Sequence, residues 1–155
     1  MSDLTIRPVT IRPVTEADRA AWQLLFSDYL AFYETTRPEA LFDTAFARLL
    51  SDDPQEFSGL LAELDGEIVG LTHYLFHRHM WSEANTCYLQ DLFVAEAARG
   101  AGAGRALIEA VHDRAARSGA TGVYWLTQDF NHTARRLYDE VAELTPFIKY
   151  NMPVT

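Results

Sequence analysis

The sequence predicts a single mixed α/β domain, and three observations support this prediction. The chain has 155 residues, enough for one domain with a substantial core. Hydrophobic residues make up 48% and charged residues 23%, the balance of an ordinary globular protein. Segments with apolar residues at helical spacing alternate along the chain with short apolar runs that are flanked by turn-forming residues.

Each expected element has its own local signal. A capping-box pattern starts the first helix, because Asp18 follows Thr15 by three residues. The Asp65-Gly66 pair marks a hairpin turn, and Gly119 closes an amphipathic helix. The expected order is a strand at 10–14, a helix from about Thr15 to Tyr33, a helix at 39–50, strands at 59–64, 68–76 and 87–94, a helix at 103–118, a strand at 123–127, a helix at 131–141 and a last strand at 147–152.

The chain begins with a duplicated pentapeptide. The sequence TIRPV at residues 5–9 is followed at once by the same five residues at 10–14. Only the second copy runs directly into helix signals, so we expect it to form the first strand. The domain is therefore placed at residues 10–155, with residues 1–9 as an N-terminal extension.

The charge distribution indicates the kinds of ligand. A net charge of −9 argues against a nucleic-acid-binding protein, which usually has a basic face. Residues 16–65 contain eleven acids against three arginines, a net of −8, whereas residues 99–117 contain four arginines against two acids, a net of +2. This asymmetry is typical of a protein that holds an anionic cofactor and a cationic substrate.

Targeting signals and disulfides are not expected. No apolar run approaches the ~20 residues of a membrane-spanning helix. The first residues lack the basic start and apolar stretch of a signal peptide. Cys87 is the single cysteine, which fits a reducing compartment. We therefore expect a cytoplasmic protein with no membrane partner.

The most informative segment is a glycine-rich loop between a strand and a helix, with the sequence RGAGAG at residues 99–104. Its glycines allow backbone N–H groups to converge, and the helix directs its positive end there, which favours a pyrophosphate. The Walker A motif is excluded because the loop has no lysine. The Rossmann spacing fails because Arg105 takes the sixth position, so a nucleotide-dependent oxidoreductase is disfavoured.

Two motifs resemble the GNAT superfamily of N-acetyltransferases. The first is Arg99-x-x-Gly102-x-Gly104, which follows the strand, and the second is Asn131-x-x-Ala134-x-x-x-Tyr138. Residues 88–94 and 123–127 are similar to the histone/polyamine acetyltransferase branch. The resemblance implies the GNAT fold, a mixed and mostly antiparallel sheet flanked by helices. It also implies acetyl-CoA as co-substrate. A metal is not expected, because the histidines match no standard zinc spacing.

The resemblance assigns the residues that hold coenzyme A. They come from the end of the strand, the glycine-rich loop and the later helix. By this resemblance they are Leu92, Phe93, Val94, Arg99, Gly100, Ala101, Gly102, Ala103, Gly104, Arg105, Asn131, Ala134, Arg135 and Tyr138.

The chemistry requires a base for the amine and an acid for the leaving thiolate. By resemblance Tyr138 is the candidate acid. The polyamine enzymes carry a glutamate where this chain has Gln90, so the base is left open between Asp91, Gln90 as a group that orients water, and a water relay. Strand alternation predicts that Gln90 and Asp91 face opposite sides, so that only one of them meets the substrate.

Aromatic residues and histidines complete the candidate site. By resemblance the acceptor pocket is formed by Tyr29, Phe32, Tyr33, Trp81 and Gln128. His73, His77 and His79 match no standard zinc spacing and are expected to be solvent-facing or structural, with His77 a distant base candidate.

The predicted function is acetyl transfer from acetyl-CoA to a primary amine. The acceptor is a polyamine-like small molecule, an amino acid, or a protein lysine or N-terminus. The alternative is a catalytically idle acyl-CoA-binding regulatory module, because Gln90 replaces an acid. A homodimer is expected, because the short C-terminal part leaves a strand edge that needs cover.

Overall fold

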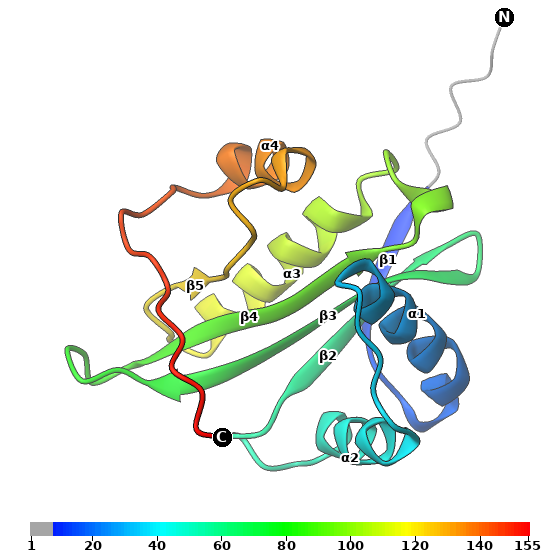
Figure 1. The fold of residues 1–155 in the computed structure, drawn as a ribbon, viewed down its shortest axis with the longest axis horizontal. Helices are drawn as coiled ribbons and strands as arrows, with labels where there is room; N and C mark the ends of the chain where they lie inside the picture. The colour runs from blue at the N-terminus through cyan, green and yellow to red at the C-terminus, as the bar shows by residue number, and fades with distance from the viewer. Residues whose placement is uncertain (1–7) are drawn as a thin grey trace, which may run out of the picture.

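The computed structural model describes residues 8–155 and contains one five-stranded sheet. The strands follow one another across the sheet in chain order (Figure 1). The first four pair antiparallel, and the fifth runs parallel to the fourth, which confirms the mixed, mostly antiparallel prediction. The strands are β1 (Val9–Pro13), β2 (Ser58–Leu64), β3 (Glu67–Arg78), β4 (Asn85–Val94) and β5 (Val123–Tyr124).

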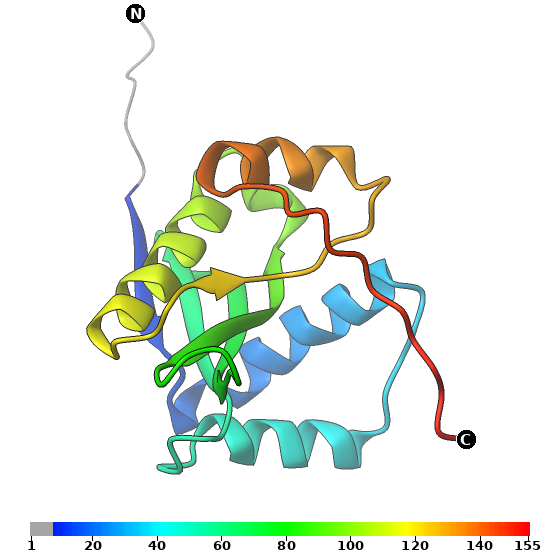
Figure 2. The same cartoon turned by 90° about the vertical axis from the view of Figure 1, so that its left-hand side faces the viewer.

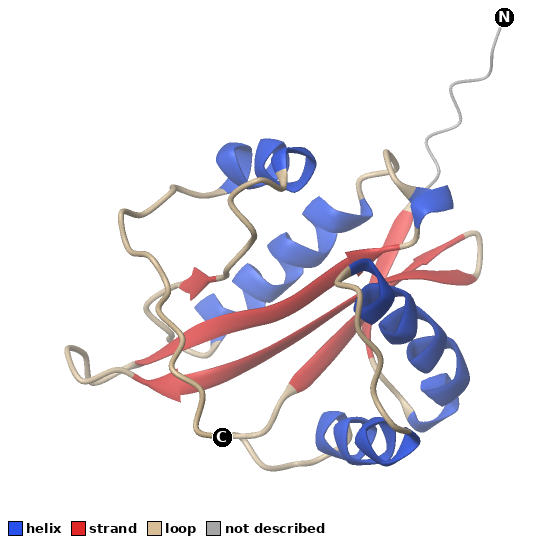
Figure 3. Ribbon diagram, in the orientation of Figure 1, coloured by secondary structure: helices blue, strands red, loops and turns tan. Residues whose placement is uncertain are grey.

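Helices cover both faces of the sheet. Figures 2 and 3 show α1 and α2 on one side of the sheet and α3 on the other. The helices are α1 (Arg19–Phe32), α2 (Glu39–Leu49), α3 (Ala103–Arg117) and α4 (His132–Val141), with short 3-10 turns at Glu16–Asp18 and Glu96–Ala98. None of the helices in the described part of the chain is long and apolar enough to span a membrane.

Strand alternation divides the core into two clusters. Leu61 and Leu71 are fully buried and pack against Trp22 of α1. Their neighbour Leu60 points to the other face, where it packs with Leu107 of α3. Because side chains alternate along a strand, consecutive leucines in β2 supply both clusters. This arrangement fixes α1 above β3 and β4, where the candidate site lies.

The predicted chain order holds at the N-terminus. The second TIRPV copy supplies most of β1, which starts one residue earlier, at Val9. The capping box forms, with the Thr15 N–H donating to the Asp18 carboxylate at 2.7 Å. Most of the first copy lies outside the described residues.

The C-terminal part differs from the prediction. The strand expected at 123–127 is limited to Val123–Tyr124, because the chain leaves β4 after these two residues. The strand expected at 147–152 does not form, and residues 142–155 run as an extended segment without a neighbour in the sheet (Figure 3). A strand needs a paired neighbour, and this segment has none among residues 8–155.

Candidate active site

A β-bulge places Gln90 and Asp91 at the same cavity. Asp91 pairs with His73, whereas the next pair along is Tyr74 with Leu89, so Gln90 is an extra residue in β4. An extra residue interrupts the regular alternation of side chains. Both Gln90 and Asp91 line one cavity, which corrects the expectation that they face opposite sides.

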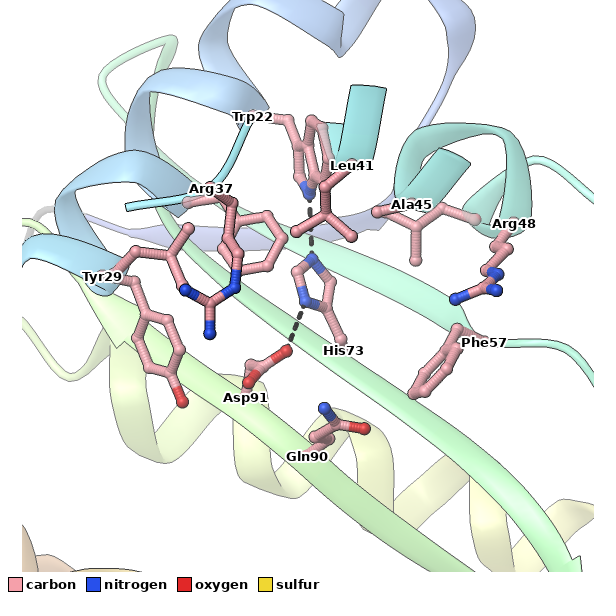
Figure 4. Close-up of a pocket in the computed structure, with 13 residues that line it drawn as sticks. Trp22, Tyr29, Arg37, Leu41, Ala45, Arg48, Phe57, His73, Gln90 and Asp91 are labelled. Carbon is pink, nitrogen blue, oxygen red and sulfur yellow. Dashed lines mark hydrogen bonds and ion pairs between the residues drawn. The ribbon is translucent and has the colours of Figure 1, made fainter. Parts of the chain in front are cut away.

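This cavity lies between α1, α2 and the middle of the sheet and has a volume of about 290 Å³. Its walls are largely apolar and aromatic, and include Phe26, Tyr29 and Phe57. Three charged side chains also line it, Asp91 from β4, Arg37 from the α1–α2 connection and Arg48 from α2. Figure 4 shows the Arg37 side chain reaching into the cavity and Asp91 pointing into it from the strand.

Asp91 ends a buried chain of hydrogen bonds. The Trp22 indole N–H donates to His73 Nε2 at 2.9 Å, and His73 Nδ1 lies 2.8 Å from Asp91 Oδ2 (Figure 4). Trp22 is 0% and His73 5% exposed, so His73 is a buried structural partner and not a solvent-facing side chain. The sequence gives no signal for these hydrogen bonds, because Trp22 and His73 lie 51 residues apart and His73 and Asp91 lie 18 residues apart.

A row of tyrosines leads from Asp91 towards α4. Burial first, and then the Asp91 carboxylate and Tyr33, raise the pKa of Tyr29. The rings of Tyr29 and Tyr33 are in edge contact at 5.1 Å. Burial and the nearby Tyr33 raise the pKa of Tyr138 to about 12. Tyr138 is therefore protonated at neutral pH and can donate a proton.

The opening for a ligand lies between β4 and β5. The two strands pair only at Cys87–Val123 and Tyr88–Tyr124, so in the described part of the chain the outer edge of β4 beyond Tyr88 has no strand partner. Trp125 continues from β5 and packs on Tyr138, with ring centroids 5.4 Å apart. The separation of these strands leaves main-chain groups near Phe93 and Val94 able to bind an extended ligand.

The glycine-rich loop has the conformation that its sequence predicts. Gly100 and Gly102 have φ values of +90° and +86°, and a Cβ on either would meet nothing within 4 Å. Among residues 8–155, no backbone carbonyl accepts from the N–H groups of residues 100–105. Free N–H groups at the start of α3, beside open space, suit a pyrophosphate. The residues present therefore fit coenzyme A.

The two arginines beside this loop differ in their partners. Arg99 lies over the Phe93 ring at 6.0 Å and donates to the Val94 carbonyl at 3.3 Å. Arg105 forms ion pairs with Glu140 and Glu109, which neutralise its charge. The positive charge expected beside the loop from Arg105 is therefore neutralised by Glu109 of α3 and Glu140 of α4.

Two residues at the start of the motif on α4 hold the helix in place. Asn131 caps the helix, as predicted, by accepting from the Ala134 N–H at 3.3 Å. Arg135 donates to the Asp129 carbonyl at 2.7 Å. These contacts fix the start of α4 and so the position of Tyr138.

Some residues expected in the acceptor pocket lie outside the cavity. Trp81 is in the β3–β4 loop and is 87% exposed. Phe32 is 51% exposed, and Gln128 lies in the loop before α4, where its carbonyl accepts from the Asn131 N–H. His77 bonds the Tyr124 hydroxyl at 2.7 Å, away from the cavity. Within residues 8–155, no group of three or more potential metal-ligating side chains converges.

Comparison with known proteins places the chain in a family. Residues 21–142 match the acetyltransferase (GNAT) family. The chain is 35% identical to the D-amino-acid N-acetyltransferase HPA3 of Saccharomyces cerevisiae, over 92% of this chain and 89% of the relative. It is 32% identical to the uncharacterized N-acetyltransferase YhfO of Bacillus subtilis, over 94% and 98%.

Solved structures share the fold. One of a probable acetyltransferase has a TM-score of 0.82 at 24% identity, covering 94% of this chain and 98% of that one. The aminoglycoside N-acetyltransferase AAC(6')-Iy in complex with CoA has a TM-score of 0.80 at 17% identity, covering 96% and 97%. The chain belongs to the GNAT acetyltransferase family. It is an acetyl-CoA-dependent N-acetyltransferase.

Proposed function

We propose that this enzyme acetylates the amino group of an amino acid. The observation that supports it is the presence of both charge signs in one cavity. Asp91 supplies a negative charge for an ammonium group, and Arg37 and Arg48 supply positive charges for a carboxylate. A zwitterion matches this pattern, whereas a polyamine would place a second cation beside two guanidinium groups.

Arg37 is the better of the two arginines for a carboxylate. Its guanidinium donates to the Thr35 hydroxyl at 2.6 Å and the Thr36 carbonyl at 2.8 Å, and no carboxylate among residues 8–155 pairs with it. Arg48 has Glu56 at 4.0 Å. The Arg37 guanidinium thus keeps free N–H donors at the mouth of the cavity. The named activity of the yeast relative, on D-amino acids, agrees with this assignment.

Asp91 is the proposed base. An alkylamine with a pKa of about 10.4 needs about 4.6 kcal/mol to lose its proton at pH 7, so the reaction needs a group beside the amine that accepts this proton. Asp91 lines the cavity, its side chain is 14% exposed, and His73 holds one of its oxygens at 2.8 Å. Gln90 lines the same wall and can orient the amine or a water molecule, but cannot accept the proton.

Tyr138 is the proposed acid at the other end of the site. Acetyl-CoA supplies the activated acetyl group, and its expected path passes the glycine-rich loop and the open edge of β4. The Tyr138 phenol lies beside Trp125 on the far side of the opening between β4 and β5. With a pKa of about 12 the phenol is protonated at neutral pH, as the acid of this step must be.

A thermodynamic cycle on Arg37 tests the substrate class. Turnover is measured as free thiol released from acetyl-CoA, with an amino acid and with the amine that lacks only its carboxylate. Arg37→Gln is expected to raise KM for the amino acid about 10-fold and to leave the decarboxylated amine unaffected, because a partly exposed ion pair is lost. Equal effects on both substrates would show that Arg37 does not bind the carboxylate.

The cycle has an internal control in this chain. Arg19→Gln removes an arginine that pairs with Glu39 and Asp43 outside the cavity, so both substrates should be turned over as by the unaltered enzyme. The protein contributes no background thiol, because Cys87 is fully buried and burial raises the pKa of its thiol to about 11.

We further propose that the enzyme is a homodimer. Six apolar side chains of the C-terminal segment are between 72% and 93% exposed, and they are Leu144, Phe147, Ile148, Tyr150, Met152 and Val154. At about 150 Å² each they amount to about 900 Å², close to the ~800 Å² that each partner buries in a standard interface. Light scattering should give a dimer for the native chain and a monomer for Ile148→Asp. A monomeric native chain would contradict the proposal.

A further inference from the structure

We infer that Trp22 and His73 are positioning residues that make Asp91 the proton acceptor, a role that rests on the proposed reaction. The inference starts from the indole of Trp22. An indole nitrogen donates a hydrogen bond and never accepts one. His73 Nε2, at 2.9 Å from it, must therefore be the acceptor and carries no proton.

The tautomer of His73 follows from this bond. With Nε2 occupied as an acceptor, the ring proton of the neutral imidazole sits on Nδ1, which lies 2.8 Å from Asp91 Oδ2. Protonating Nε2 would bring two N–H groups face to face at 2.9 Å in a site that is 0% to 5% exposed. His73 is thereby held as a neutral donor and is removed from proton transfer.

Packing keeps the three groups in place. The His73 ring is in edge contact with Phe26 at 5.0 Å, and Trp22 contacts Phe26 at 5.4 Å. All buried side-chain polar atoms in the described part of the chain have hydrogen-bond partners, so the chain of bonds is complete. A base whose orientation is set by a packed partner loses less entropy when it meets its substrate.

The electrostatics of the cavity agree with this division of roles. The other charged or titratable groups that line it are Tyr29 from α1, Arg37 from the α1–α2 connection and Arg48 from α2. Two of the three are cations, which leaves Asp91 as the anionic side chain of the cavity lining. Asp91 is consequently the anion in the cavity that can receive the proton of an ammonium group.

The first test is nitrogen NMR of the histidine side chains in the native protein, which needs no substrate. His73 should show a protonated Nδ1 and a bare Nε2 at neutral pH, with the exposed His112 and His132 as reference side chains in the same spectrum. A protonated Nε2 on His73 would overturn the inference. Failure of the proposed reaction leaves this result unchanged.

The second test uses the pH dependence of kcat/KM with any amine that is turned over. Trp22→Phe removes the donor to Nε2 and with it the constraint on the His73 tautomer, so the profile should gain an ionisation that the native enzyme lacks. Phe42→Leu is the matched control, because Phe42 packs on Trp22 at 6.1 Å but touches neither hydrogen bond. A new ionisation in both variants, or in neither, would contradict the inference.

A pair of variants at His73 separates positioning from packing. In His73→Asn the amide nitrogen is bonded to Cγ, as Nδ1 is, and can still donate to Asp91, whereas His73→Leu has no donor. We expect kcat to fall about 10- to 100-fold further in the leucine variant, the effect of losing a hydrogen bond to a charged group. Equal losses of kcat would indicate a purely structural role.

Discussion

Replacing Asp18 by asparagine should destabilise the protein by about 2 kcal/mol at neutral pH. Arg12 grips the Asp18 carboxylate with two N–H groups, each at 2.8 Å, and the Thr15 N–H donates to it at 2.7 Å. The hydrogen bond from Arg12, together with those from Thr15, lowers the pKa of Asp18 from 3.8 to about 2. At about 1.36 kcal/mol per pKa unit, this difference corresponds to roughly 2 kcal/mol.

The environment supports a value of this size. The Asp18 side chain is 6% exposed, so its ion pair is shielded from water. Arg12 is 30% exposed and keeps Glu63 at 2.7 Å, so removal of Asp18 does not leave a buried, unpaired charge. The loss should accordingly stay below the 3–5 kcal/mol typical of breaking a fully buried pair.

The sign of the pH dependence follows from the lowered pKa. The stabilisation is complete above the unfolded-state pKa of about 3.8 and is lost as the pH falls through the folded-state pKa of about 2. Urea unfolding of both proteins, followed by circular dichroism, should give the full difference at pH 7 and a smaller one at pH 3. A loss of stability under about 0.5 kcal/mol for Asp18→Asn at pH 7, on the order of an ordinary surface substitution, would contradict this account of the ion pair. A difference in stability that is unchanged at pH 3 would contradict it as well. Glu63→Gln is the control, and its more exposed pair should be worth about 1 kcal/mol or less.

Two further predictions concern the coenzyme side of the site. Gly102→Ala should lower the free energy of unfolding by about 1 kcal/mol and raise KM for acetyl-CoA, because φ is +86° there; Gly122→Ala, where φ is ordinary and space is open, should change neither quantity. Tyr138→Phe should lower kcat about 100-fold with little change in stability, since the ring still packs on Trp125. The pKa of about 12 also predicts that the native enzyme keeps the function of this acid beyond pH 10, and a loss of kcat centred near pH 10 would count against Tyr138.

Local patterns predicted most of the fold. Apolar periodicity placed the four helices, and Thr15, Asp18 and Asn131 gave correct helix starts because caps depend on neighbouring residues only. The last strand could not be predicted this way. Residues 147–152 have strand-forming side chains, but a strand exists only where another edge receives it.

The candidate site could be predicted where it depends on neighbouring residues, and could not where it depends on tertiary packing. The glycine-rich loop is a local motif, and its positive φ values follow from its glycines. The shared orientation of Gln90 and Asp91 depends on a bulge against His73, which no residue pattern indicates. The bonds that join Trp22, His73 and Asp91, and the entry of Arg37 into the cavity, arise from tertiary packing of three separate segments.

The most direct test of the central claim is thiol release from acetyl-CoA with a panel of acceptors under one set of conditions. The panel holds amino acids of both chiralities, their decarboxylated amines, polyamines and lysine peptides. The cavity with Asp91 beside Arg37 predicts the highest kcat/KM for an amino acid. Preferential turnover of a polyamine or a peptide, with amino acids inert, would contradict the assignment of the carboxylate to Arg37 and of the substrate to this class.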